Sequence, residues 1–170
     1  VAHPVFKKIL YFVTIDTLSR AAFPMESGNK KRVMKFINEC SNWNDKDKVS
    51  AVQLKLALEE NEIRSGKLYD SSEHCIRSWI LGQIQQPKDD LTHQRAEQLA
   101  TSDESEYVNK NRYSELLYTY RNSLLHEFRE PGRGMELGND LPPTPYYIYM
   151  DHISTGQNSW ELRFPVQFLK

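Results

Sequence analysis

Three side chains in one predicted helix are suited to chemistry on a phosphodiester. Arg121 and Asn122 are adjacent, and His126 follows with four residues between it and Arg121. An arginine presents a fixed positive fork to phosphate oxygens, a histidine exchanges a proton near neutral pH, and an asparagine between them orients or holds a leaving group. The spacing alone is weak support, because a chain of this length is expected to match it about once by chance. The surrounding residues therefore decide whether this match indicates a functional site.

The residues around this motif predict an amphipathic helix over 106–128. Apolar side chains recur there at helical spacing and define a stripe that must face a core, namely Tyr113, Leu116, Leu117, Tyr120, Leu124 and Phe128. The opposite face carries the polar residues Glu115, Thr119, Asn122, His126 and Arg129. Arg121 lies about 140° from His126 around the helix axis. Either the arginine side chain curls back across the turn, or a second copy of the helix supplies the missing partner across a twofold axis.

With these residues the chain resembles the HEPN superfamily of all-helical domains. Its ribonuclease members carry Arg, four to six residues and then His, commonly with a polar residue directly after the Arg. Arg121, Asn122 and His126 match this pattern, and the resemblance covers about residues 111–130. It implies a homodimer in which the motifs of two protomers form one composite, metal-independent site that cleaves RNA. The segment RNSLLHEFREPG is also similar to this helix in bacterial HEPN-like proteins of unassigned role.

A ribonuclease of this kind would need neither a metal ion nor a cofactor, because the 2′-OH of RNA is an internal nucleophile beside the adjacent phosphorus. His126 would be the general base or acid, Arg121 would stabilise negative charge in the transition state, and Asn122 would orient a hydrogen bond. Two copies in a dimer would provide one histidine for each proton transfer. The product would carry a 2′,3′-cyclic phosphate. Whether the chain is an enzyme at all is left open by its sequence.

A structural role would explain the same residues. His126 near a helix end would favour the C-terminal dipole, and Arg121 would pair with Glu115 or Glu127. The chain would then be a non-catalytic HEPN-like dimer that binds a nucleotide, a nucleic acid or a protein. Such a protein partner would be an antitoxin or a nucleotidyltransferase, in a toxin–antitoxin or defence system. A third interpretation places the functional surface on the polar insert at 87–106 and on a C-terminal hairpin.

The charge of the chain restricts where RNA could bind. The formal net charge is −1, so the protein lacks the overall positive field of a dedicated nucleic-acid coat. RNA contact would require a local patch, for which the candidates are Lys30, Lys31, Arg32, Lys35 and Arg129. The first four form the densest positive cluster in the chain, which is equally typical of a solvated helix face.

The spacing of the cysteines and the hydropathy of the chain indicate the cellular compartment of the protein. Cys40 and Cys75 show no CxxC spacing and no nearby His pair, which argues against zinc and favours free, buried thiols in a reducing cytosol. No segment approaches the ~20 apolar residues of a membrane span. We therefore expect a cytoplasmic protein without membrane contact.

The length and the hydrophobic pattern predict one domain with a sizeable core, mainly α. We expect a HEPN-like antiparallel helical bundle over residues 1–132. A Gly/Pro loop and a β-hairpin, over 133–170, would pack on the same core. The predicted helices cover 4–22, 30–40, 51–61, 72–85, 89–100 and 106–128, and the predicted strands cover 146–150 and 160–168. In the first helix, the residues expected to face inward are Phe6, Ile9, Leu10, Val13 and Leu18.

Overall fold

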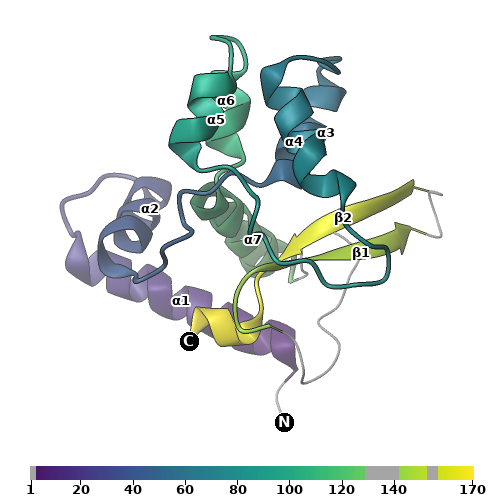
Figure 1. The fold of residues 1–170 in the computed structure, drawn as a ribbon. Helices are drawn as coiled ribbons and strands as arrows, with labels where there is room; N and C mark the ends of the chain where they lie inside the picture. The colour runs from purple at the N-terminus through teal and green to yellow at the C-terminus, as the bar shows by residue number, and fades with distance from the viewer. Residues whose placement is uncertain (1–2, 129–141, 153–156) are drawn as a thin grey trace.

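The computed structural model of the protein describes residues 3–128, 142–152 and 157–170, which are mainly helical with a two-stranded antiparallel hairpin near the C-terminus. The helices are α1 (Pro4–Ala22), α2 (Asn29–Cys40), α3 (Ala51–Glu60), α4 (Lys67–Arg77), α5 (His93–Leu99), α6 (Ser105–Lys110) and α7 (Tyr113–Glu127). The strands are β1 (Tyr146–His152) and β2 (Gln157–Arg163), and a 3₁₀ turn, η1 (Val166–Leu169), follows them. Figure 1 shows α3 to α6 grouped at one end and α1 along the other, with α7 running between them. The prediction of a mainly α fold with a C-terminal hairpin is confirmed.

The first three helices begin and end within one residue of their predicted bounds. For α3, Ser50 caps the helix, since its hydroxyl accepts a hydrogen bond from the Gln53 backbone N–H at 3.2 Å. The alternation of Leu54, Leu56 and Leu58 with other residues is also compatible with a strand, but the structure confirms the predicted helix.

Three helices further along the chain differ from their predicted bounds. α4 begins before residue 72 and ends well before residue 85, and α5 begins after its cap Thr92 rather than at residue 89. The predicted helix 106–128 is interrupted at Asn111, which separates α6 from α7. The interruption has a tertiary cause: the Asn111 carbonyl accepts from the Ser50 N–H at 3.0 Å, and the Tyr113 N–H donates to the Lys48 carbonyl at 2.8 Å.

The core consists of two main groups of buried side chains, one at each end of the fold. The first group joins α1, α2, α7 and the segment after β2, and contains Phe12, Val33, Ile37, Leu117, Tyr120, Leu124 and Phe164. The second lies among α3 to α6 and contains Val49, Leu54, Leu58, Leu68, Tyr69, Ala96 and Val108. Most of the apolar stripe predicted for the helix over 106–128 is buried as expected, but Phe128 at its end is 69% exposed.

The buried face of α1 is not the predicted one. Its buried residues are Lys8, Phe12 and Ser19, and Ile9 packs beside them. Four residues expected to face inward are exposed instead, namely Phe6, Leu10, Val13 and Leu18. The helix is apolar on both sides, so the hydrophobic period alone does not select the side that is buried. The inner side accepts even the Lys8 ammonium, which donates to the Tyr120 hydroxyl at 2.9 Å.

The aromatic residues of the hairpin cover the helical core, in agreement with the expectation that the hairpin packs on it, since a sheet of two strands needs an apolar partner to be stable. Tyr147 is fully buried, its ring centroid lies 4.7 Å from that of Trp79, and Trp160 packs on the same indole at 5.1 Å. The second strand ends at Arg163 rather than at residue 168, because Pro165 cannot donate to a strand ladder and η1 follows.

A buried polar network joins the hairpin to α3 and α7. The Asp90 carboxylate, 6% exposed, accepts hydrogen bonds from the hydroxyls of Tyr113 and Tyr147 and from the Ala51 backbone N–H. The Tyr147 hydroxyl also lies 2.8 Å from Ser50 Oγ. Burial raises the pKa of the Asp90 carboxyl above its ordinary value, although the two tyrosine hydroxyls oppose the shift.

Candidate functional site

The Arg121 guanidinium is held against α1 by Asp16. Its Nε donates to Asp16 Oδ1 at 3.0 Å, and its Nη2 donates to Asp16 Oδ2. The side chains of Arg121 and Asp16 are only 7% and 16% exposed. A bidentate pair of this kind neutralises the arginine and fixes its geometry.

Asn122 and Tyr118 complete the surroundings of this arginine. The third guanidinium nitrogen, Nη1 of Arg121, donates to Asn122 Oδ1 at 2.6 Å. The guanidinium carbon lies 5.4 Å from the centre of the Tyr118 ring, within the range of a cation–π contact. All three nitrogens of Arg121 therefore have a protein partner, and Asn122 orients the arginine.

His126 lies apart from this cluster. It is exposed in the last turn of α7, just before Phe128 adopts a left-handed conformation, with φ of 54°. The imidazole makes no hydrogen bond to any residue that the structure describes. Within one chain the structure brings Arg121 and Asn122 together and leaves His126 in solvent near the helix C-terminus.

The predicted intrahelical partners of Arg121 are wrong. Its partner Asp16 lies 105 residues away in sequence, and Glu115 instead forms an ion pair with Lys30 at 2.8 Å. A single sequence gives no signal for this contact, because it depends on how α7 crosses α1. Glu127 lies in the exposed last turn of the same helix.

The basic cluster on α2 is partly compensated by neighbouring groups. Besides the pair of Lys30 with Glu115, Lys35 lies 3.9 Å from Glu26, and Arg32 donates to the Asn29 side chain at 3.0 Å. Lys31 is exposed. Exposed ion pairs contribute little free energy, so these lysines can still exchange a carboxylate for a phosphate. The remaining candidate for RNA binding, Arg129, lies outside the described residues.

One hollow among the described residues is a groove that sequence reasoning did not predict. It has a volume of about 850 Å³, within the range of small-molecule sites, and is bounded by α1, α2, the loop after α2 and η1. Its aromatic lining is Tyr11, Phe36, Trp43 and Phe168. The rim carries the amides of Asn42 and Asn44 and the carboxyl of Asp45. A tryptophan flanked by asparagines in a polar loop is the signal that the sequence offered.

A second hollow, of about 640 Å³, lies beside α4 and contains Asp70, His74, Cys75 and Asp89. The Cys75 thiol donates to the Asp89 carbonyl at 3.1 Å, and burial raises its pKa to about 11. Across residues 3–128, 142–152 and 157–170, no three His, Cys, Asp or Glu side chains are arranged to hold a metal ion. Of the two cysteines, Cys75 is buried as expected and Cys40 is exposed.

Comparison of the chain with models of protein families, with curated proteins and with solved structures finds no match. Among the described helices, none combines the length and the apolar character that crossing a bilayer requires.

Proposed function

We propose that this protein is a non-catalytic HEPN-like helical domain that binds a partner rather than cleaving RNA. The observation that carries the proposal is the engagement of Arg121 by Asp16. An arginine that stabilises a phosphorane-like transition state must present its donors to the substrate. Here the donors face α1, and releasing them would leave a carboxylate without its counter-charge.

The ligand that best fits the groove is a nucleobase. Aromatic walls stack on the flat face of a base, and side-chain amides such as those of Asn42 and Asn44 form hydrogen bonds to its edge. α2 forms one wall of the groove through Phe36 and Ile37 and carries Lys31 and Lys35 on the opposite side of the helix. These cations would accept the phosphates of a single-stranded RNA that continues from the groove around α2.

Trp43 gives a direct measurement of binding, because it lies in the groove whereas Trp79 and Trp160 pack under the hairpin. We expect a short single-stranded RNA to quench the tryptophan fluorescence of the protein, and a Trp43→Phe variant to lose the response. Trp79→Phe is the matched control and should keep it. Lys31→Glu should weaken RNA binding by about tenfold and lower its salt dependence.

The same fluorescence titration with free nucleotides distinguishes a single base from RNA as the ligand. Equal affinity for a mononucleotide and an RNA oligomer would identify the base as the ligand, whereas tighter, salt-dependent binding of the oligomer would identify RNA. Absence of a Trp43-dependent response to both ligands would reject the groove as a base-binding site.

A ribonuclease is the second candidate, and it is favoured by the exposed position of His126, where a second copy can reach it. Under the non-catalytic proposal, incubation with RNA should give no cleavage above background, and His126→Ala should behave as the native protein. Gel electrophoresis of end-labelled RNA, with and without a chelator, measures this. Products ending in a 2′,3′-cyclic phosphate that disappear in the His126→Ala variant would establish the ribonuclease instead.

A further inference from the structure

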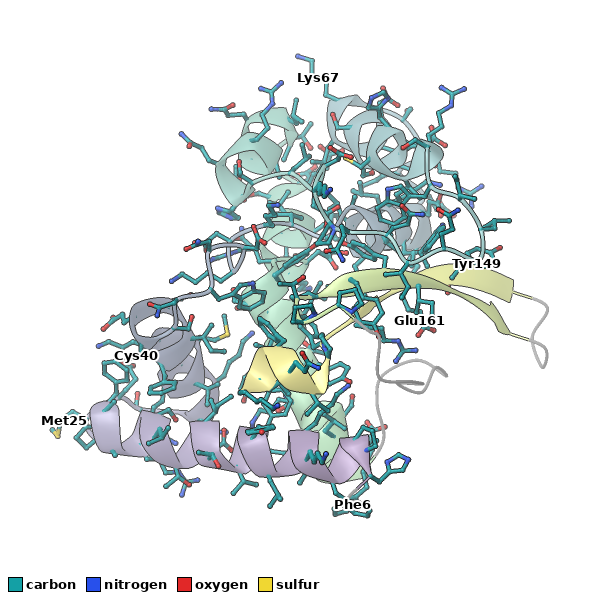
Figure 2. All side chains as sticks on the ribbon, turned by 60° about the horizontal axis from the view of Figure 1, so that its bottom comes forward. Phe6, Met25, Cys40, Lys67, Tyr149 and Glu161 are labelled. Carbon is teal, nitrogen blue, oxygen red and sulfur yellow. The ribbon has the colours of Figure 1, made fainter. Side chains whose placement is uncertain are left out.

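A carboxylate lies on the rim of the aromatic groove. The groove is bounded by α1, α2, the loop after α2 and η1, and Figure 2 shows α2, which ends at Cys40, and η1 both lying against α1. Asp45 comes from the loop after α2 and is the only acidic residue among the described residues that line the groove. A ligand in the groove must therefore either hydrogen-bond to this carboxylate or avoid it.

The loop that carries Asp45 is held in place by contacts on two sides. The Lys46 ammonium donates to the Asn38 carbonyl of α2 at 2.6 Å. The Trp43 ring packs edge-to-face with Phe168 of η1, with 4.8 Å between the ring centroids. An aromatic wall and a carboxylate two residues apart are thus positioned before a ligand binds, which lowers the entropic cost of binding.

One oxygen of the Asp45 carboxylate is engaged and the other is open. The Lys48 ammonium lies 3.2 Å from Oδ1 and also donates to the Pro87 carbonyl at 3.1 Å, so it orients the carboxylate. Oδ2 has no hydrogen-bond partner in the described part of the chain, and the Asp45 side chain is 44% exposed. Each carboxylate oxygen has two lone pairs. The group can therefore accept two parallel hydrogen bonds from a ligand while it keeps its lysine.

Guanine is the base whose hydrogen-bonding groups match a carboxylate. Its Watson–Crick edge carries two adjacent donors, N1–H and the N2 amino group, which are spaced for the two oxygens of one carboxylate. On the same edge, the amino group of adenine or cytosine lies beside a ring nitrogen that accepts, and the N3–H of uracil lies between two carbonyls. A carboxylate would repel each of these neighbouring acceptors.

Two side-chain amides beside Asp45 provide donors for the acceptors of the same base. Asn42 and Asn44 are exposed and line the groove, and neither side chain has a hydrogen-bond partner among the residues that the structure describes. Their N–H groups can donate to O6 or N7 of guanine. The rim therefore offers both the paired acceptor and the donors that guanine requires.

We propose that the groove is selective for guanine and that Asp45 recognises its Watson–Crick edge, a selectivity that rests on the proposed function because it uses the same groove. The carboxylate also repels phosphate, so the base enters the groove and its phosphate stays outside. A free guanine nucleotide and an unpaired guanine in RNA present the same edge to Asp45.

Titration of the Trp43 fluorescence with single nucleotides measures this selectivity. Affinity is taken from the concentration at half-saturation, because bases quench tryptophan to different extents. GMP should bind at least about tenfold more tightly than AMP, CMP or UMP, since only guanine gives two hydrogen bonds to the charged acceptor. IMP has the N1–H but lacks the N2 amino group, so it is the matched probe and should bind about tenfold more weakly than GMP.

Asp45→Asn tests the residue that carries the selectivity. Its amide presents one acceptor and one donor group, which pair with adenine rather than with guanine. The variant should lose at least about tenfold in affinity for GMP and bind AMP at least as tightly as GMP. The matched control is Asp47→Asn, which removes the same charge at a carboxylate that pairs with Arg112 instead, and it should keep the preference for GMP. Circular dichroism should show that both variants are folded.

Two RNA oligomers that differ in a single guanosine or adenosine distinguish the sources of the base. The guanosine oligomer should bind more tightly than the adenosine oligomer, and its affinity relative to GMP shows whether RNA or the free nucleotide is preferred. Equal affinities for the four nucleotides, or a preference for GMP that persists in Asp45→Asn, would overturn the guanine selectivity and leave the groove as a base-binding site. A protein whose Trp43 responds to no nucleotide and to no oligomer would overturn both.

Discussion

Replacing Asp16 by alanine is expected to destabilise the protein by about 3 kcal/mol, because the buried Arg121 guanidinium loses its counter-charge. Two of the three guanidinium nitrogens would lose their acceptor, and solvent reaches little of the side chain. Urea denaturation at pH 7, followed by circular dichroism, measures the free energy of unfolding.

Two further variants separate this effect from general damage to α1. The double variant Asp16→Leu with Arg121→Met replaces the ion pair by apolar groups and should recover most of the loss, since breaking a buried pair costs more than removing both partners. His126→Ala, at an exposed position, should change the stability by less than about 0.5 kcal/mol. If Asp16→Ala were as stable as the native protein, Arg121 would not depend on Asp16 and would be available to a ligand, which would count against the non-catalytic proposal.

Replacing Asp90 by alanine is expected to cost about 3 kcal/mol or more. The substitution leaves the hydroxyls of Tyr113 and Tyr147 and the Ala51 N–H without their shared acceptor in the core. Tyr147→Phe removes only one donor from the same network and should cost about 1–2 kcal/mol. A loss in Asp90→Ala no larger than in Tyr147→Phe would show that the carboxylate does not organise the network.

The raised pKa of Asp90 predicts how this contribution depends on pH. The folded protein binds the proton of this carboxyl more tightly than the unfolded chain does. The stabilising contribution is therefore complete below the ordinary carboxyl pKa of about 3.9, falls as pH rises through the interval up to the raised value, and is constant above it. Asp90→Asn does not titrate, so its stability deficit relative to the native protein should be smaller at pH 7 than at pH 4. A deficit that grows with pH would mean that the tyrosine hydroxyls lower the pKa of Asp90 instead.

The local features of the fold could be predicted from the sequence, and its long-range contacts could not. Pro4 and Phe23-Pro24 mark the ends of α1, and Ser50 marks the start of α3, because capping and chain stiffness act over a few residues. The side of α1 that is buried was predicted wrongly, since both sides are apolar and only the position of α7 distinguishes them.

In the candidate site, too, local features could be predicted from the sequence and long-range contacts could not. The spacing of Arg121, Asn122 and His126 predicted one polar cluster on a helix, but the structure joins only Arg121 and Asn122, and the partner of the arginine comes from α1. The groove is assembled from several separate segments, so only its tryptophan was visible in the sequence. The resemblance to HEPN domains stays a prediction that the RNA experiments will test.

The interruption between α6 and α7 has a consequence for how the chain folds. Backbone hydrogen bonds tie Ser50 to Asn111 and Lys48 to Tyr113, so α7 starts on a segment that precedes it by more than sixty residues. The same segment leads directly into α3, and α7 contributes to the core beside α1. Neither end of the molecule can therefore order fully while the other is denatured, which makes folding cooperative and, because the joining contacts are so distant along the chain, slow for a helical protein.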